Sequence, residues 1–600
     1  MKSVVRIANA SGYWGDDPEA LYRQVTGGEV DYVTMDFLAE ITMVILQRQR
    51  ARDPRAGFAY DFVEQLERAL PAIAERGTTV IVNAGGINPA GCAEAIDALC
   101  HKAGLSLPIG VISGDDLLAR LDALEAAGAQ LDHMDGERRY DEIRGRVVAA
   151  NAYISARPVA EALRGGARIV VTGRTTDAAL ILAPLAYEFG WAWDDWDRLA
   201  AGIAAGHILE CGAQATGGNF TDWLRVPSML DMGYPIAEVQ PTGSFVVTKH
   251  PGTGGVVTPR TITEQLLYEI GDPIAYLTPD VSADFTALQL TQEGADRVRV
   301  SHARGAPPPT TLKVSMVYRQ GYRAVGTVLI SGPNVIAKGE RLAEMIWHRV
   351  GTDFADRRTD FIGFNACWGG AAAAEPEPNE VVFRVAVADP DRAKLQRFAK
   401  HLLGFALQGP PGLGIFGGRP EVQEAFGFWP ALVPRDLVTA SVAVRHDGRE
   451  TTVDVPLRLP EADRAVRPAA PDAPADGAPT PARSTRLQRT RLGTIAYARS
   501  GDKGDDANIG VAARSAEAYA FLRETLSANR VRAFYRDRVA GPVVRYELPN
   551  LLAFNFLLRH ALGGGGTLSL RVDHQGKTLA QGLLTMELDV PDDVLASVGA

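Results

Sequence analysis

The segment Thr79-Val-Ile-Val-Asn-Ala-Gly-Gly-Ile-Asn-Pro89 contains the pattern from which the fold of this chain can be inferred. It begins with an apolar, β-branched run, continues through a small glycine-containing loop, and leads into a helical pattern that reaches Leu99. Strands that are apolar throughout are typical of parallel sheets with helices on both faces. The segment therefore predicts one strand–loop–helix unit.

The same unit recurs along the first 300 residues. Apolar runs at 3–9, 32–37, 107–112 and 168–172 are each followed by a loop and a helical pattern. This alternation predicts an α/β domain over residues 1–300, built on a doubly wound, mostly parallel sheet. Ligands of such sheets bind at the carboxyl ends of the strands, so the loops that follow the strands are candidate sites.

Beyond residue 300 the pattern changes. Residues 312–318 and 323–330 alternate like half-exposed antiparallel strands, which predicts an α+β domain over 301–465. Residues 466–488 are rich in Pro and Ala and are expected to form an extended tether. Residues 489–600 are expected to form a small ferredoxin-like α+β domain. Strands of this domain are expected at 493–498, 568–572 and 583–588.

Composition limits the classes of partner. The chain has 62 Lys and Arg against 72 Asp and Glu, a net charge of −10, which argues against nucleic acid or an anionic membrane as the main partner. Its 4 cysteines are scattered, without the spacing of a disulfide framework or a zinc site. No apolar run is long enough to span a membrane. We therefore expect a soluble, cytoplasmic protein without a bound metal.

The first candidate site is the segment from His207 to Asn219. A helix that starts after Asp195 would place His207 one turn before Cys211, with Glu210 beside it, and would end at Gly212. These three side chains offer an imidazole, a carboxylate and a thiol as candidate catalytic groups. The turn that follows is expected to offer unpaired backbone groups and short polar side chains to a carbonyl or oxyanion of the substrate. Its candidate ligand-binding residues are Gln214, Thr216, Gly217, Gly218 and Asn219. The structural alternative is a buried cysteine followed by an ordinary turn.

Two further loops follow predicted strands and add candidate ligand-binding residues. The loop at 83–86 contributes Asn83, Gly85 and Gly86, whose small size allows close backbone approach. The loop at 172–177 contributes Arg174 and Asp177; the arginine is suited to a carboxylate or phosphate, or else the pair braces the turn. Neither loop matches a dinucleotide or nucleoside-triphosphate motif, so those ligands have little support.

Four motifs carry a resemblance to a known family. Residues 83–89, Glu210-Cys-Gly-Ala-Gln-Ala-Thr-Gly-Gly-Asn-Phe220, 249–255 and 498–510 together resemble the acyclic terpene utilisation protein AtuA. The resemblance covers nearly the whole chain and implies a large N-terminal and a small C-terminal domain. It also implies a role in the breakdown of citronellol- and geraniol-type isoprenoids through acyl-CoA intermediates, beside a biotin-dependent acyl-CoA carboxylase.

Two function hypotheses follow. The first is an enzyme acting on a branched acyl-CoA, with no bound cofactor and with the coenzyme A thioester as substrate. Glu210 would be the acid–base group of a hydratase or lyase, or Cys211 and His207 would form an acyl-enzyme. The second is a non-catalytic accessory or scaffold subunit of the carboxylase. A homo-oligomer is expected in either case.

Cationic residues near glycine turns are predicted to contact the coenzyme. Lys249 and His250 precede a glycine turn, where a cation and backbone amides suit phosphate groups; the alternative is a solvated charged turn. Asp502 and Lys503 lie in a Gly-Asp-Lys-Gly-Asp turn of the terminal domain and are predicted to contact a ligand or an interface.

Overall fold

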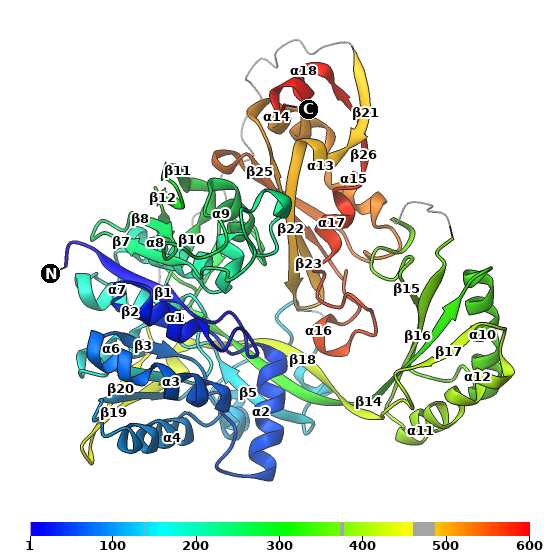
Figure 1. Ribbon diagram of the computed structural model, residues 1–600. Helices are drawn as coiled ribbons and strands as arrows, with labels where there is room; N and C mark the ends of the chain where they lie inside the picture. Colours follow the sequence, from blue (N-terminus) through cyan, green and yellow to red (C-terminus); the bar gives the residue numbers. More distant parts are fainter. Residues whose placement is uncertain (1, 137, 372–376, 460–485, 600) are drawn as a thin grey trace. The chain divides into compact units, whose positions relative to one another are not determined.

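The computed structural model describes residues 2–136, 138–371, 377–459 and 486–599. The chain divides into two compact units (Figure 1). The first comprises Met1–Val317, Trp429–Pro479 and Glu547–Ala553, and the second comprises Tyr318–Phe428, Thr480–Tyr546 and Phe554–Ala600. The predicted tether at 466–488 lies outside the described residues as far as residue 485.

The first unit is built on an 11-stranded sheet. Its centre consists of five neighbouring parallel strands, in the order β1, β2, β3, β6, β4. All of them lie at positions where the sequence predicts strands. Their bounds are Val5–Asn9 (β1), Tyr32–Met35 (β2), Thr79–Val82 (β3), Ile109–Ser113 (β4) and Ile169–Thr172 (β6).

The remaining strands of this sheet are antiparallel, so the predicted doubly wound, mostly parallel sheet is corrected to a mixed one. Strands β7, β8, β12 and β11 extend it beyond β1, and β19 and β20 extend it beyond β4. Strands β19 and β20 come from the region predicted as a separate α+β domain, because a local pattern does not reveal which distant strand a segment will pair with. The bounds are Ile236–Val239 (β7), Phe245–Thr248 (β8), Gln289–Gly294 (β11), Arg297–Ser301 (β12), Thr439–His446 (β19) and Arg449–Pro456 (β20).

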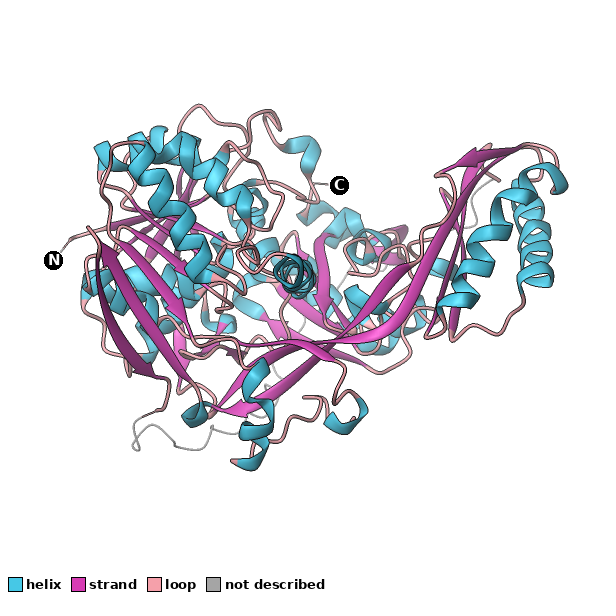
Figure 2. Cartoon of the chain, turned by 90° about the horizontal axis from the view of Figure 1, so that it is seen from below, coloured by secondary structure: helices cyan, strands magenta, loops and turns pink. Residues whose placement is uncertain are grey.

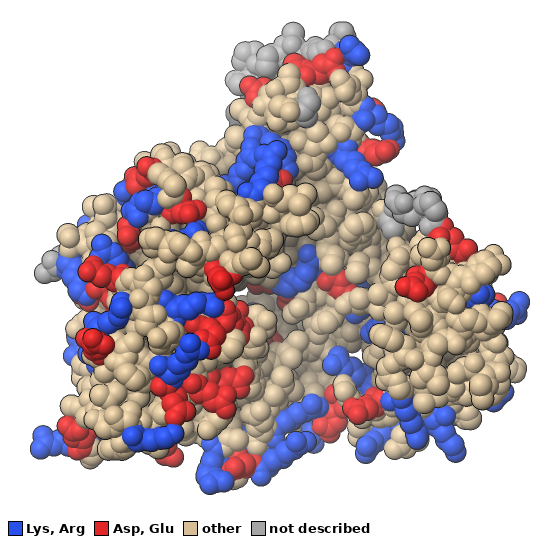
Figure 3. Space-filling model, viewed as in Figure 1, with Lys and Arg blue, Asp and Glu red and all other residues tan. Residues whose placement is uncertain are grey.

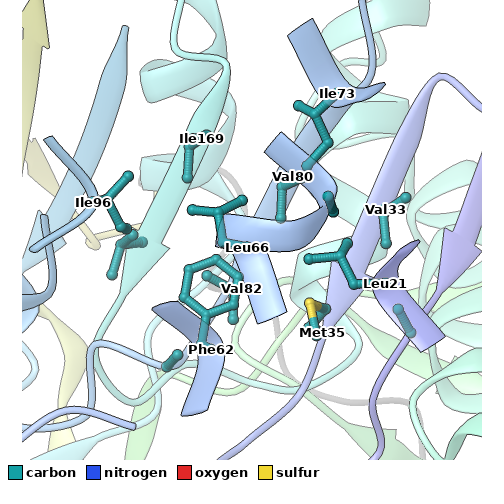
Figure 4. Close-up of a cluster of buried hydrophobic side chains, with 14 of the residues drawn as sticks. Leu21, Val33, Met35, Phe62, Leu66, Ile73, Val80, Val82, Ile96 and Ile169 are labelled. Atoms are coloured by element: carbon teal, nitrogen blue, oxygen red, sulfur yellow. The ribbon is translucent and has the colours of Figure 1, made fainter. Parts of the chain in front are cut away.

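Helices cover both faces of the parallel centre. Alternate residues such as Val33, Met35 and Val82 pack against Leu21 and Phe62 of the helices on one face (Figure 4). On the other face Gly110 lies against Ala162, where a larger side chain would collide. The first layer is α1 (Ala20–Thr26), α3 (Tyr60–Arg76) and α4 (Pro89–Lys102); the second includes α6 (Arg157–Arg164), α7 (Ala179–Phe189) and α8 (Trp196–Leu209).

Several shorter elements complete the first unit. Strands β9, β10 and β13 form a small antiparallel sheet next to α8. The bounds are Glu40–Arg52 (α2), Leu121–Ala126 (α5), Val147–Ala152 (β5), Pro259–Leu266 (α9), Tyr276–Leu277 (β9), Ser282–Asp284 (β10) and Arg304–Ala306 (β13).

In the second unit an antiparallel sheet has α10 and α11 on one face (Figures 1 and 2). The two strands expected at 312–318 and 323–330 are one long strand, β14, because Gly321, at φ 132°, continues the chain without a reversal. The elements are β14 (Thr311–Ser331, in this unit from Tyr318), α10 (Val335–Val350), β15 (Asp356–Ile362), β16 (Glu380–Asp389), α11 (Arg392–His401), α12 (Phe405–Gln408), β17 (Leu413–Phe416) and β18 (Gln423–Pro434, in this unit as far as Phe428).

The C-terminal segments form a four-stranded sheet in the order β22, β23, β25, β24. The strand expected at 568–572 is not found, because the end of α16 and a loop occupy that part of the chain. The strand expected at 583–588 is displaced: it begins only at Glu587, as β26, after α17. The elements are β21 (Leu487–Arg491), α13 (Leu492–Ile495), β22 (Ala496–Lys503), β23 (Asp506–Ala513), α14 (Ala516–Thr525), α15 (Ala528–Phe534), β24 (Val543–Leu548), β25 (Ala553–Leu558), α16 (Gly565–Leu568), α17 (Leu579–Leu583), β26 (Glu587–Pro591) and α18 (Asp592–Ser597).

The surface carries charge of both signs. On the face drawn in Figure 3, Lys and Arg side chains are interspersed with Asp and Glu. Among the helices in the described ranges, none combines the length and the apolar character needed to cross a bilayer.

Candidate functional site

Polar side chains gather where the parallel strands of the first unit end. Asp36 follows β2, Asn83 follows β3, Arg174 follows β6 and Asp115 follows β4. Because these strands are parallel neighbours, their carboxyl ends share one edge of the sheet. Asn83 and Arg174 are among the residues predicted from the sequence, whereas Asp36 and Asp115 are not, although a carboxylate soon after an apolar run could have indicated them.

Arg174 is the centre of this group, and only 4% of its surface is exposed. Its guanidinium Nη1 donates to the Leu38 carbonyl and to Asp177 Oδ1, at 2.8 Å each. The guanidinium lies 4.3 Å from the ring centroid of Tyr153. Its backbone N–H donates to Asp115 Oδ2 at 2.8 Å, so both the main chain and the side chain of Arg174 are fixed.

Asp36 and Asn83 hold each other in a buried pair. Asn83 donates from Nδ2 to Asp36 Oδ1 and accepts from the Phe37 N–H at 2.7 Å. Burial raises the pKa of Asp36 to about 6; the nearby Glu210 adds to the rise, while Arg174 and Asn83 oppose it. Asp36 therefore keeps its proton to a higher pH than an ordinary aspartate.

Further carboxylates surround the arginine. Burial raises the pKa of Asp177 well above its usual range, with Asp36, Glu210 and Glu40 adding to the rise and Arg174 opposing it. For Glu40, burial would raise the pKa, but the charges of Lys313 and Arg174 outweigh it and lower the pKa to about 2. Glu40 thus loses its proton at a lower pH than Asp36 and Asp177.

Glu40, Tyr153 and Lys313 were not identified from the sequence. Tyr153 donates from its hydroxyl to Glu40 Oε1 at 2.9 Å, and Lys313 Nζ lies 3.9 Å from the same oxygen. The three residues come from α2, the segment after β5, and β14. No local motif links them, and only the tertiary fold brings them to Arg174.

The C-terminal end of α8 brings two of the predicted catalytic residues to the same place. His207 Nδ1 and Glu210 Oε1 are 2.9 Å apart, and the imidazole packs against the rings of Tyr276 and Phe285 at 5.1 and 5.4 Å. Burial, followed by the charges of Glu210, Asp177 and Cys211, raises the pKa of Tyr276.

Cys211 is at the same edge, but not as the partner of the imidazole. A side chain at Gly12, in the loop after β1, would collide with the backbone of Cys211, so the two segments are in close contact. His207 Nδ1 is engaged by Glu210, and Nε2 has no hydrogen-bond partner among the described residues. The arrangement thus pairs the imidazole with a carboxylate rather than with the thiol.

The turn after Cys211 differs from the expected oxyanion turn. Thr216 Oγ1 donates to the Gly233 carbonyl at 2.5 Å, so this side chain points into the protein. The N–H groups of Gly217 and Gly218 donate to the carbonyls of Gln214 and Ala213. Asn219 is exposed and adopts a left-handed conformation with φ 54°. The amides of the two glycines therefore close the turn itself.

The glycines of the 83–86 loop have a packing role. A side chain at Gly85 would collide with the Thr172 carbonyl of the neighbouring strand end. Gly86 has φ 54°, and a side chain there would collide with Leu46. Both positions require glycine because the loop lies close against its neighbours.

Lys249 and His250 are buried and satisfied away from the Arg174 group. Lys249 Nζ lies 3.1 Å from Asp296 Oδ2 and donates to the Thr253 carbonyl at 2.9 Å. His250 Nε2 is 2.9 Å from the Gln24 carbonyl oxygen, and burial lowers the pKa of this histidine. His250 lines a cavity of about 220 Å³ that includes none of the residues around Arg174.

Asp502 and Lys503 belong to the second unit, at the hairpin that joins β22 and β23. Asp502 Oδ1 is 3.2 Å from Lys577 Nζ. Their predicted role at a ligand or an interface stays a prediction. In the part of the chain that the structure describes, no three His, Cys, Asp or Glu side chains converge as metal ligands would.

Comparison with known proteins gives two matches to family models. The model of the acyclic terpene utilisation family protein AtuA matches residues 5–444. The model of the AtuA ferredoxin-like domain matches residues 490–589. No curated protein and no solved structure showed a significant match to the chain.

Proposed function

The chain belongs to the acyclic terpene utilisation family AtuA, and from this membership we propose that it is an enzyme that acts on a branched, isoprenoid acyl-CoA. The family implies a role in acyclic terpene utilisation. The observation that carries the finer proposal is the position of Arg174 among carboxylates of contrasting proton affinity, at the carboxyl edge of the parallel strands. Pairs of titratable groups with separated pKa values are typical of acid–base sites.

Hydration, dehydration or carbon–carbon cleavage beside a thioester needs a polarised carbonyl and a proton donor and acceptor. The guanidinium of Arg174, which Leu38, Asp177 and Tyr153 hold in place, is the positive charge that would polarise this carbonyl. In this proposal Asp36 and Asp177 supply protons. Glu210, oriented by His207, is the proton acceptor.

The contacts of His207 favour acid–base chemistry over an acyl-enzyme. A thiol nucleophile needs a base within hydrogen-bond distance. His207 Nδ1 contacts Glu210, and Nε2 has no hydrogen-bond partner among the described residues, Cys211 included. Thioester cleavage through Cys211 would therefore require the imidazole to turn away from Glu210.

The test uses a 3-methyl-branched enoyl-CoA with the full chain. Calorimetry measures binding, and chromatography of the CoA esters measures conversion. We expect saturable binding and turnover, and Glu210→Gln should lower turnover by about 100-fold or more with little change in binding. Glu188→Gln is the matched control, since Glu188 also lies near a helix end, and its side chain is 17% exposed against 13% for Glu210.

Full turnover in Glu210→Gln would contradict the acid–base assignment. The enzyme proposal is wrong if the protein neither binds nor converts the ester. If it then binds the biotin-dependent acyl-CoA carboxylase, the result supports the alternative function of an accessory subunit.

A further inference from the structure

A second charged group lies in the second unit, on one face of the sheet formed by β14, β16 and β15. Arg384 of β16 stands directly opposite Asp360 of β15. Arg358 and Arg323 stand two and four positions further along the same face, across from Ala386 and Ala388. The opposite face carries the apolar core packed under α10 and α11. Basic side chains are thus concentrated on the face that the helices leave uncovered.

Two further arginines reach this place from the C-terminal segments of the same unit. Arg538 donates from Nη2 to the carbonyls of Asn365 and Ala366, at 3.2 and 2.6 Å. Arg571 donates from Nη1 to the carbonyl of Arg538 at 3.0 Å and to that of Ala561. Arg384 is held in the same way, by the Leu570 carbonyl at 2.7 Å. We call Arg358, Arg384, Arg538 and Arg571 the arginine cluster.

Positive charge exceeds negative charge in the cluster. Asp360, with 2% of its side chain exposed, accepts from both Arg358 and Arg384, at 2.7 and 2.9 Å. Burial, together with the charges of Arg358 and Arg571, lowers the pKa of Arg538 to about 10 against the opposing charge of Asp360. Burial and Arg358 also lower the pKa values of Arg384 and Arg571, against Asp360 at Arg384 and against Asp505, Asp360 and Asp356 at Arg571. The positive charges of the arginines therefore repel one another, and a bound anion would reduce this repulsion.

The guanidinium groups also retain donors for a ligand. Within the described residues, each member of the arginine cluster donates hydrogen bonds from a single side-chain nitrogen: Nε of Arg358, Nη1 of Arg384, Nη2 of Arg538 and Nη1 of Arg571. Backbone carbonyls and Asp360 hold these nitrogens, and the remaining guanidinium N–H groups make no hydrogen bond within the described residues. Fixed donors bind with a smaller loss of side-chain freedom.

We propose that the arginine cluster is a binding site for a phosphate-bearing ligand. Guanidinium forks match the oxygens of phosphate and pair with them bidentately, and four of them suit a ligand with more than one phosphate charge. Coenzyme A and a free pyrophosphate share this chemistry. The proposal stands independently of the acid–base site around Arg174, because no residue is common to the two.

The experiment titrates the full chain with pyrophosphate and with coenzyme A by calorimetry. We expect both to bind, and Arg358→Gln to weaken both by about tenfold or more, since one charge-assisted pair is lost. Arg357→Gln is the matched control: Arg357 neighbours Arg358 on β15 but lies 5.0 Å from the Trp347 ring on the opposite face of the sheet. Tighter binding of coenzyme A than of pyrophosphate would identify the coenzyme as the source of the phosphates, and equal binding would identify a free phosphate ligand.

A second variant separates ligand binding from folding. Asp360→Asn removes the carboxylate that now offsets two of the arginines. Pyrophosphate should therefore raise the melting temperature of this variant by more than it raises that of the unaltered chain. The proposal is overturned if neither anion binds, or if Arg358→Gln and Arg357→Gln bind both anions as the unaltered chain does.

Discussion

A single buried side chain, Arg174, balances the charges at the carboxyl edge of the parallel strands. Its guanidinium contacts Asp177 and Tyr153, and its charge acts on Asp36 and Glu40 as well. The pKa of Asp36 is raised because burial outweighs the charge of Arg174. The pKa of Glu40 is lowered because the charges of Lys313 and Arg174 together outweigh burial. The same charges therefore give neighbouring carboxyl groups different protonation states.

The raised pKa of Asp36 makes stability depend on pH. A folded-state pKa of about 6 exceeds the unfolded value of 3.8, so the folded state binds the proton more tightly. The contribution of Asp36 to the free energy of unfolding is therefore complete below pH 4 and is lost as the pH rises through 6. The free energy of unfolding should fall by about 3 kcal/mol over this range. Asp36→Asn should reduce this loss, as measured by urea unfolding between pH 4.5 and 7.5.

The control for this prediction is Asp53→Asn. Hydrogen bonds from Arg55 lower the pKa of Asp53, so its removal cannot flatten a decline between pH 4 and 6. An Asp36→Asn protein with the same pH slope as the unaltered chain would show that Asp36 ionises normally.

At the scale of elements, the turn from β6 into α7 positions Arg174. Gly173 lies between the strand end and the arginine, and any side chain there would collide with the Asp115 carboxylate. That carboxylate accepts from the Arg174 N–H and from Asn151 Nδ2, at 2.8 and 2.9 Å. The turn thus uses a glycine to admit the carboxylate that fixes the backbone of Arg174.

Gly173→Ala should destabilise the protein by about 1–3 kcal/mol, because the added methyl group displaces Asp115 from a packed site. It should also weaken binding of the branched acyl-CoA, since Arg174 moves with the turn. Gly271→Ala is the control, because a side chain at Gly271 meets no atom within 4 Å, and its effect should stay within about 0.5 kcal/mol. Equal melting temperatures for the two variants would contradict the prediction that a side chain at Gly173 collides with Asp115.

At the scale of the whole molecule, each compact unit is assembled from separate stretches of chain. The second unit joins residues before and after the predicted tether. Trp368 Nε1 donates to the Thr578 carbonyl at 3.0 Å, and Arg538 Nη2 donates to the Ala366 carbonyl at 2.6 Å. These contacts connect parts of the chain that a cut in the tether would separate.

The composition of residues 467–483 predicts preferential cleavage there by a protease of broad specificity, although most of the tether lies outside the described residues. We expect the two fragments to remain associated, since contacts within the second unit join them. Size-exclusion chromatography of the cut protein, followed by denaturing electrophoresis, measures this. Cleavage concentrated elsewhere would refute the tether, and separate elution of the fragments would refute the shared unit.

The sequence alone determined the local architecture of the parallel strands. Apolar runs such as 79–82 and 169–172 identify strands because burial on both faces demands apolar residues at successive positions. The same reasoning located Asn83 and Arg174, since the loops after parallel strands share one edge. It also identified the family, because the motifs at 83–89 and 210–220 are long and specific.

Only the tertiary structure decided the pairing of distant segments. Strand β19 joins β4, and Tyr153 and Lys313 reach Glu40, through contacts that no local pattern encodes. The sequence could not show that Lys249 pairs with Asp296, or that the amides of Gly217 and Gly218 bond within their own turn. Whether a polar group is available to a ligand depends on its neighbours in space, and those neighbours are set by the packing of the whole fold.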